Sequence, residues 1–133
     1  MIYPMFTLIA LTILVGFITV KARLKAVKSQ ELNSQYFALM QGQKPPESII
    51  KTTRCFNNLF ELPTLFYAAC LLSIIARHDS YVILVLAWLF VIARLLQAYI
   101  HLTYNNVKHR MYAFGASVIS VTALWVYLVL NNS

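Results

Sequence analysis

Residues 81–104 of the chain read YVILVLAWLFVIARLLQAYIHLTY. An apolar run of this length is typical of a transmembrane helix, which needs about 20 predominantly apolar residues to cross the hydrocarbon core of a bilayer. Three further stretches have the same character, at about residues 2–28, 48–77 and 107–130. Because the connections between them are short, the sequence predicts an all-α protein. We expect one domain over residues 1–133, built as a four-transmembrane-helix up-down bundle.

The composition also indicates a membrane protein rather than a soluble domain. Of the 133 residues, 60% are hydrophobic and 11% are charged. Soluble domains usually carry about 25% charged residues. Four short helices bury little surface among themselves, so we expect the protomers to associate.

The basic residues are not spread evenly. The formal net charge is +7, and a cluster of cationic side chains lies at the end of the first apolar run and in the loop after it: Lys21, Arg23, Lys25, Lys28, Lys44 and Lys51. This bias predicts cytoplasmic first and third loops, with both termini outside the cytoplasm. The cluster also fits an anionic ligand, but nothing resembles a nucleic-acid-binding module, so no nucleic-acid partner is predicted. The compact chain favours a bacterial inner membrane.

A polar stripe runs along the second apolar stretch. Arg54, Asn58 and Glu61 are spaced i, i+4, i+7, so they lie on one face of a helix. Charged residues at bilayer depth are costly and often mark a functional site. Pro63 follows closely, and because proline lacks a backbone N–H, we expect a kink near Leu59 and a carbonyl that needs another partner.

A second polar stripe, formed by Arg94, Gln97 and His101, lies on the third apolar stretch. The two helices run in opposite directions, so Glu61 and Arg94 come to a similar depth. The spacing predicts a buried ion pair between these two residues, and a contact between Arg54 and His101.

Two interpretations of these stripes remain open. In the first, a buried ion pair fixes the register of the helices. In the second, a polar pocket opens toward the cytoplasm, with Tyr112 in reach and with five side chains as its lining: Arg54, Asn58, Gln97, His101 and Arg110. Arginines present a planar fork that suits carboxylates, so such a pocket fits a zwitterionic, carboxylate-rich ligand.

Metal and disulfide chemistry are not indicated. The three histidines are scattered and share no ligand spacing with the cysteines, so no metal site is predicted. Cys55 and Cys70 lie in one helix about 22 Å apart, which is too far for a disulfide.

Two motifs resemble those of a known family. Residues 54–63, RCFNNLFELP, resemble the R-x-x-x-N-x-x-E signature with a following proline on the second helix of the MAPEG family, membrane-associated proteins in eicosanoid and glutathione metabolism. Residues 93–102, ARLLQAYIHL, resemble the A-R-x-x-[HY]-x-x-x-Y-L stretch of its third helix. Arg110 matches the fourth-helix arginine, and Arg23 matches a basic position that contacts ligand. The chain is similar to bacterial-type microsomal glutathione transferases of this family.

The resemblance implies a homotrimer with glutathione at each protomer interface, as a cosubstrate. Arg110 is then the catalytic residue that stabilises the glutathione thiolate, because a nearby cation lowers the pKa of a thiol. Eight further residues are expected to bind glutathione: Arg23, Arg54, Asn58, Glu61, Arg94, Gln97, His101 and Tyr112. The chain departs from the family pattern in three places, where Gln97, His101 and Phe114 stand at positions usually held by His or Tyr.

These expectations lead to one main hypothesis and two alternatives. The main hypothesis is an integral membrane glutathione-dependent transferase or peroxidase acting on hydrophobic electrophiles. The first alternative is a non-catalytic membrane protein that binds a lipid or another anionic ligand in the same inter-subunit cavity. The second is a small transporter or assembly subunit in which the stripes are structural. The expected partners are further copies of the chain, membrane lipid and a hydrophobic small molecule.

Overall fold

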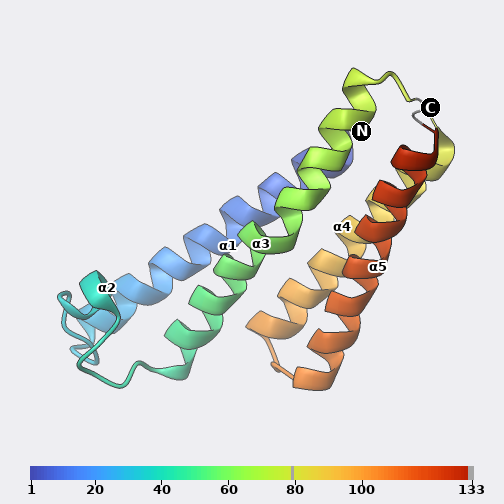
Figure 1. Ribbon diagram of the computed structural model, residues 1–133. Coiled ribbons are helices and arrows are strands. Elements are labelled where there is room, and N and C mark those ends of the chain that lie inside the picture. Colours follow the sequence, from blue (N-terminus) through green and yellow to red (C-terminus); the bar gives the residue numbers. More distant parts are fainter. Residues whose placement is uncertain (79, 132–133) are drawn as a thin grey trace.

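Four long helices and one short helix make up the fold (Figure 1). The structure, a computed structural model, describes residues 1–78 and 80–131. The helices are α1 (Ile2–Lys28), α2 (Tyr36–Leu39), α3 (Glu47–Ile75), α4 (Tyr81–Leu102) and α5 (Val107–Asn131). The long helices α1, α3, α4 and α5 are each long and apolar enough to cross a membrane. Their ends differ by at most two residues from those expected from the sequence, and the predicted all-α fold with four membrane-spanning helices is confirmed.

The four long helices alternate in direction. In Figure 1, α1 and α4 descend, α3 and α5 ascend, and both termini lie at the same end. Helix α1 packs against α3, and α4 packs against α5. The ribbons of the two pairs converge near the termini and diverge toward the other end, where α2 and the turn between α4 and α5 lie. The structure therefore has the predicted up-down order.

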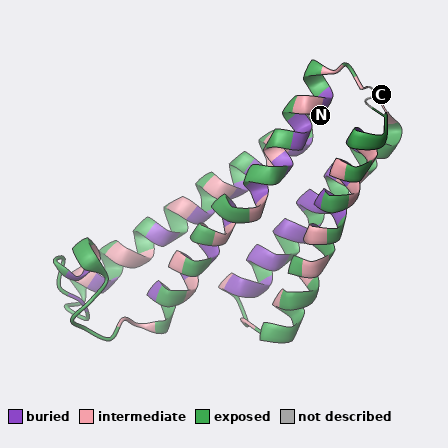
Figure 2. Cartoon of the chain, in the orientation of Figure 1, coloured by how far each residue is buried: buried purple, intermediate pink, exposed green. Residues whose placement is uncertain are grey.

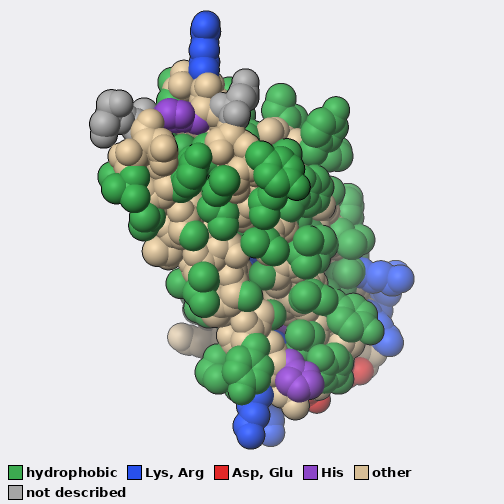
Figure 3. Space-filling model, turned by 90° about the vertical axis from the view of Figure 1, so that its right-hand side faces the viewer, with side chains coloured by type: hydrophobic (Ala, Val, Ile, Leu, Met, Phe, Trp, Pro, Cys, Tyr) green, Lys and Arg blue, Asp and Glu red, His purple; other side chains and the backbone are tan. Residues whose placement is uncertain are grey.

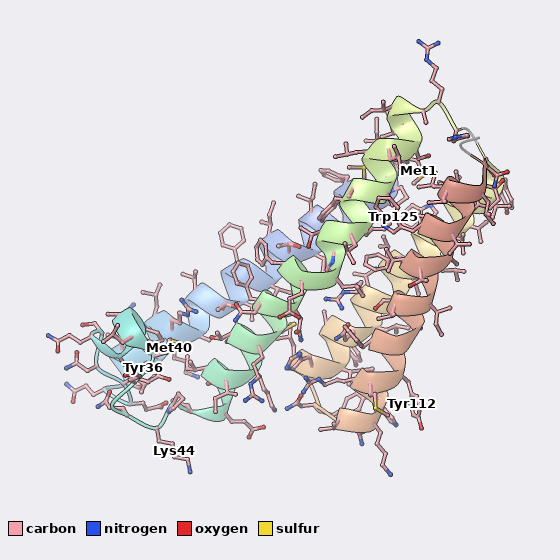
Figure 4. All side chains as sticks on the ribbon, in the orientation of Figure 1. Met1, Tyr36, Met40, Lys44, Tyr112 and Trp125 are labelled. Carbon is pink, nitrogen blue, oxygen red and sulfur yellow. The ribbon has the colours of Figure 1, made fainter. Side chains whose placement is uncertain are left out.

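The core lies between the two helix pairs. Phe66 of α3 and Phe90 of α4 are fully buried, and their rings stack with centroids 4.5 Å apart. Trp125 of α5 donates its indole N–H to the backbone carbonyl of Leu65, 3.1 Å away, which ties α5 to α3 (Figure 4). Figure 2 shows buried residues on the inward faces of the helices and exposed residues on the outward faces. Packing of this kind associates helices in lipid, where the hydrophobic effect between helices is absent.

The outward faces of the helices are apolar. Phe6, Phe17, Ile119 and Val129 are all exposed to more than half of their extent. In Figure 3 one face of the molecule is largely hydrophobic, with lysine and arginine side chains at its two ends and along one lower margin. This is the surface of an integral, multi-pass membrane protein, because lipid tails cover the apolar middle and cations reach the headgroups.

The loop between α1 and α3 contains the one helix that the sequence did not predict. Helix α2 is a single turn that buries Tyr36 against Ala26, Leu32 and Ile49. It ends at Met40, whose φ of 55° is left-handed. A single turn of helix is too short to show a periodic pattern in the sequence.

Candidate functional site

Arg94 is the most deeply buried charge in the site. Its side chain is 1% exposed on α4 and faces α3. Its Nη1 donates to Gln97 Oε1 at 2.5 Å, and its Nη2 donates to the backbone carbonyl of Asn58. The Arg94 Nε atom is also buried and has no protein partner. Arg94 therefore joins α4 to α3 through the backbone.

Pro63 lies in α3 shortly after the carbonyl that Arg94 contacts. Proline has no N–H to donate to the carbonyl of Leu59, and its ring crowds the preceding turn of the helix. The carbonyl of Asn58 lies next to that of Leu59 and accepts the Arg94 hydrogen bond. The carbonyl that was expected to need another partner is that of Leu59, so the bond from Arg94 to Asn58 does not supply it, and α3 itself runs on without a break to Ile75.

The predicted ion pair between Glu61 and Arg94 is wrong. Glu61 is exposed, and within residues 1–78 and 80–131 the single ion pair joins Lys51 to Glu47, at 2.8 Å. The Arg94 guanidinium meets the Asn58 carbonyl and Gln97 instead. Glu61 interacts with Arg94 through space without contacting it. Its side chain is on the outward surface of α3 and is free to meet another molecule.

A small polar cavity lies beside Arg94 between α3 and α4. It is lined by Cys55, Asn58, Leu59, Arg94, Gln97, Ala98 and His101. Its volume of about 10 Å³ is that of roughly one water-sized sphere. Binding pockets for small molecules usually measure about 300–1,000 Å³. This cavity is therefore too small for a tripeptide within one protomer.

The structure divides the side chains that were expected to line one pocket. Asn58, Gln97 and His101 line the cavity, whereas Arg54, Arg110 and Tyr112 do not. The expected contact between Arg54 and His101 is absent from the hydrogen bonds of the described chain, because Arg54 is exposed and His101 is 1% exposed. The charges of Arg54, Arg110 and Lys51 nonetheless act on His101 through space, so cations gather around this end of the cavity.

Arg110 is positioned by the turn between α4 and α5. Asn105 has a left-handed φ of 51°, and its Oδ1 accepts a hydrogen bond from Arg110 Nη1 at 2.9 Å. The side chain of Asn106 accepts from the backbone N–H groups of Lys108 and His109 and so caps the first turn of α5. Arg110 is half-buried, and its Nε has no protein partner. The role of Asn105 in positioning Arg110 was not predicted from the sequence.

Arg23 holds the end of α1 against its neighbours. Its Nη2 donates to Thr53 Oγ1 at 3.5 Å, and its guanidinium lies 5.5 Å from the centroid of the Phe37 ring. Arg23 is half-buried, and its Nε is buried without a protein partner. Tyr112, by contrast, is 68% exposed and points away from the bundle (Figure 4).

Glu61 occupies an unusual place for an exposed carboxylate. It lies midway along α3, about 21 Å from either end at the helical rise. Arg54 is on the same exposed side, two turns earlier. Ionisable residues inside a membrane normally face a protein interior or a water-filled cavity. The single chain leaves this carboxylate uncovered.

The described residues offer no cluster for a metal. No group of three His, Cys, Asp or Glu side chains within residues 1–78 and 80–131 is arranged to hold a metal ion. Cys55 and Cys70 are both buried and free.

The comparisons with known proteins identify the family. The model of the MAPEG family matches residues 1–130, which include both polar stripes and the turn that positions Arg110. No curated protein and no solved structure matches the chain. The resemblance seen in two short motifs therefore extends over almost the whole chain, and the protein belongs to the MAPEG family.

Proposed function

We propose that this protein is a glutathione-dependent transferase or peroxidase of the membrane, working as a homotrimer on hydrophobic electrophiles. Membership of the MAPEG family supports this proposal. The observation that carries it is the exposed polar face of α3, where Arg54 and Glu61 lie uncovered inside a membrane-spanning helix. A soluble anionic cosubstrate held between protomers would give these charges a partner.

The chemistry of glutathione suits the charges on this face. Glutathione has two carboxylates, one ammonium group and one thiol. Arg54 and Arg23 would bind carboxylates through their planar forks, and Glu61 would meet the ammonium group. Asn58, with its side chain half-buried, would offer an amide to the peptide backbone.

The buried stripe of α4 would support that site from behind. Arg94 would position α3 by holding the Asn58 carbonyl. Gln97 and His101 of α4 line the small cavity between α3 and α4. They would donate hydrogen bonds to glutathione only where a neighbouring protomer extends that cavity. Tyr112, exposed on α5, would contact a ligand held by the next protomer.

Arg110 would stabilise the thiolate. Its Nη1 is held by Asn105, and its half-buried guanidinium would place a fixed positive charge beside the thiol. A fixed cation beside a thiol lowers the pKa of that thiol and raises the thiolate fraction. The thiolate sulfur would then attack an electrophilic centre of a substrate that arrives from the lipid, forming a bond to sulfur as the leaving group departs.

Topology would set the side from which glutathione enters. The cationic end of the bundle holds the loop between α1 and α3 and the turn between α4 and α5. By the positive-inside rule this end faces the cytoplasm, and both termini lie outside it. A bacterial inner membrane fits this arrangement.

The thiolate itself gives the test. Adding glutathione to the detergent-purified protein is expected to produce the ultraviolet absorbance of a bound thiolate. Arg110→Ala should abolish that signal. Lys108→Ala removes a charge from the same turn of α5 and should preserve it. If the unmodified protein shows neither thiolate absorbance nor binding at millimolar glutathione, the proposal fails.

A lipid-binding role is the second candidate, and one observation favours it. An apolar hollow of about 320 Å³ lies between α1 and α3 and is lined by Ile9, Thr12, Ile13, Leu59, Phe60, Thr64 and Tyr67. A hollow of this kind suits an acyl chain. Mass spectrometry of the molecules retained after mild purification separates the two roles, because a lipid found in place of glutathione would favour this one.

A further inference from the structure

Three lysines form a stripe along the outer face at the end of α1. Lys21, Lys25 and Lys28 are spaced i, i+4, i+7 and are all exposed. They line a shallow hollow of about 570 Å³, together with Phe17, Val20, Leu24 and Ser29. The hollow therefore combines an apolar part nearer the middle of the helix with a cationic part at its end.

The charges of this stripe are not used within the protomer. No ion pair involves these three lysines in the part of the chain that the structure describes, where the one ion pair joins Lys51 to Glu47. Arg23 provides a contrast on the same stretch of helix. It turns inward, bonds to Thr53 and lies against Phe37. Arg23 thus makes contacts within the protein, while the three lysines face outward.

The stripe lies where the hydrocarbon of a bilayer gives way to the headgroups. Helix α1 has 27 residues and is about 40 Å long, whereas the hydrocarbon core is about 30 Å thick. About 10 Å of an upright helix of this length projects beyond the core. Lysines mark the projecting end, so Lys25 and Lys28 reach the headgroup layer and Phe17 and Val20 remain at the depth of the acyl chains.

We propose that this hollow binds an anionic phospholipid. The phosphate and the net negative charge of the headgroup meet Lys25 and Lys28, with Lys21 at the boundary of the hydrocarbon. One acyl chain lies along Phe17, Val20 and Leu24. A zwitterionic headgroup is a poorer ligand, because its own cation is repelled by the lysines. The site shares no residue with the proposed glutathione site and does not depend on it.

Native mass spectrometry of the full-length, detergent-purified protein tests the site. The protein is titrated with phosphatidylglycerol and, in parallel, with phosphatidylcholine of the same acyl chains. We expect at least a tenfold preference for phosphatidylglycerol, which corresponds to about 1.4 kcal/mol, because the lysines attract an anionic headgroup. The triple variant Lys21→Gln, Lys25→Gln, Lys28→Gln should lose this preference. Its fold should persist because the three side chains are exposed.

The matched control removes the same amount of charge elsewhere. Lys44→Gln, Arg77→Gln and Lys108→Gln change three exposed cations outside the hollow, and this variant should keep the preference. Equal affinity of the unmodified protein for both lipids overturns the proposal. So does an equal loss in the two variants, since the attraction would then be general. Displacement of the lipid by inorganic phosphate at the same concentration would assign the lysines to a soluble anion instead.

Discussion

The two polar stripes have similar spacing but different surroundings. On α4, Arg94, Gln97 and His101 are between 1% and 6% exposed. On α3, Arg54 and Glu61 are exposed. A charge that is bonded inside the protomer stabilises the bundle, whereas a charge left on the outside of a membrane-spanning helix requires another molecule. The comparison therefore separates residues of the scaffold from residues of the proposed ligand site.

Helix packing produces this difference. Helix α4 contacts α5 along its length and also packs against α1 and α3. Among the four long helices, α4 has the largest share of buried residues, which Figure 2 shows in purple. Every polar residue on its inward side must therefore find a partner inside the protein. The outward side of α3 is under no such constraint within one protomer.

Arg94→Ala is expected to have the largest effect on stability. The substitution removes the hydrogen bonds to Gln97 and to the carbonyl of Asn58, and it leaves the buried Gln97 Oε1 without this donor. We expect a loss of about 3 kcal/mol in the free energy of unfolding. Denaturation of the detergent-solubilised protein, followed by circular dichroism, measures it.

The matched control is Arg54→Ala, which removes an arginine from the exposed stripe. It should change the free energy of unfolding by no more than about 0.5 kcal/mol, while weakening glutathione binding. Equal destabilisation by the two substitutions would show that the division between a scaffold stripe and a ligand stripe is wrong.

Gln97→Leu should come next. Its Oε1 accepts a charge-assisted hydrogen bond from Arg94 Nη1, and leucine cannot accept one. We expect a loss of about 2 kcal/mol, smaller than for Arg94→Ala because Arg94 keeps its bond to the Asn58 carbonyl. The same denaturation measures it. A loss as large as that of Arg94→Ala would mean that Gln97, rather than the carbonyl, holds the arginine.

Glu61→Gln tests the exposed stripe. The change removes the charge but keeps the shape and a hydrogen-bonding group. We expect the protomer to keep its stability within about 0.5 kcal/mol, because Glu61 makes no ion pair in the described chain. Glutathione affinity should fall about tenfold, which corresponds to about 1.4 kcal/mol. Equilibrium binding and native mass spectrometry measure affinity and oligomeric state together. Unchanged affinity and unchanged assembly would place Glu61 outside the ligand site.

The sequence predicted the membrane helices well and the internal contacts of the site poorly. Long apolar runs are a strong signal, so the course of α4 could be inferred from its composition. The spacing of Glu61 and Arg94 also indicated that the two lie near each other, and their charges do interact through space. Depth, however, does not give rotation about the helix axis. Arg94 turned toward the Asn58 carbonyl beside Pro63, and Glu61 was left outside.

Hydrogen bonds to backbone atoms could not be predicted from the sequence either. A backbone carbonyl has the same chemistry at every residue, so the amino-acid sequence does not identify Asn58 as the acceptor for Arg94. Asn105 shows the same limit, because its bond to Arg110 depends on a left-handed turn. Family resemblance selected the residues of the site, while the hydrogen bonds that orient them came from the structure.

The smallest expected effect compares two glycines. A Cβ added at Gly115 of α5 would have no atom within 4 Å, whereas one at Gly16 of α1 would lie 3.2 Å from Phe56 Cε2. Alanine favours a helix over glycine by about 0.8–1 kcal/mol. Gly115→Ala should therefore stabilise the protomer by about that amount, and Gly16→Ala should gain less because Phe56 must shift. Denaturation of the two variants in detergent measures both changes in the free energy of unfolding.

The two glycine substitutions also test whether the α5 surface at Gly115 faces lipid or another protein chain. If the α5 face at Gly115 meets lipid, the added methyl group leaves the oligomeric state unchanged. If a neighbouring protomer packs closely there, as small residues allow in membranes, Gly115→Ala should weaken the assembly even as it stabilises the single chain. Native mass spectrometry of both variants distinguishes these outcomes, with Gly16→Ala as the control because its neighbour lies within the protomer.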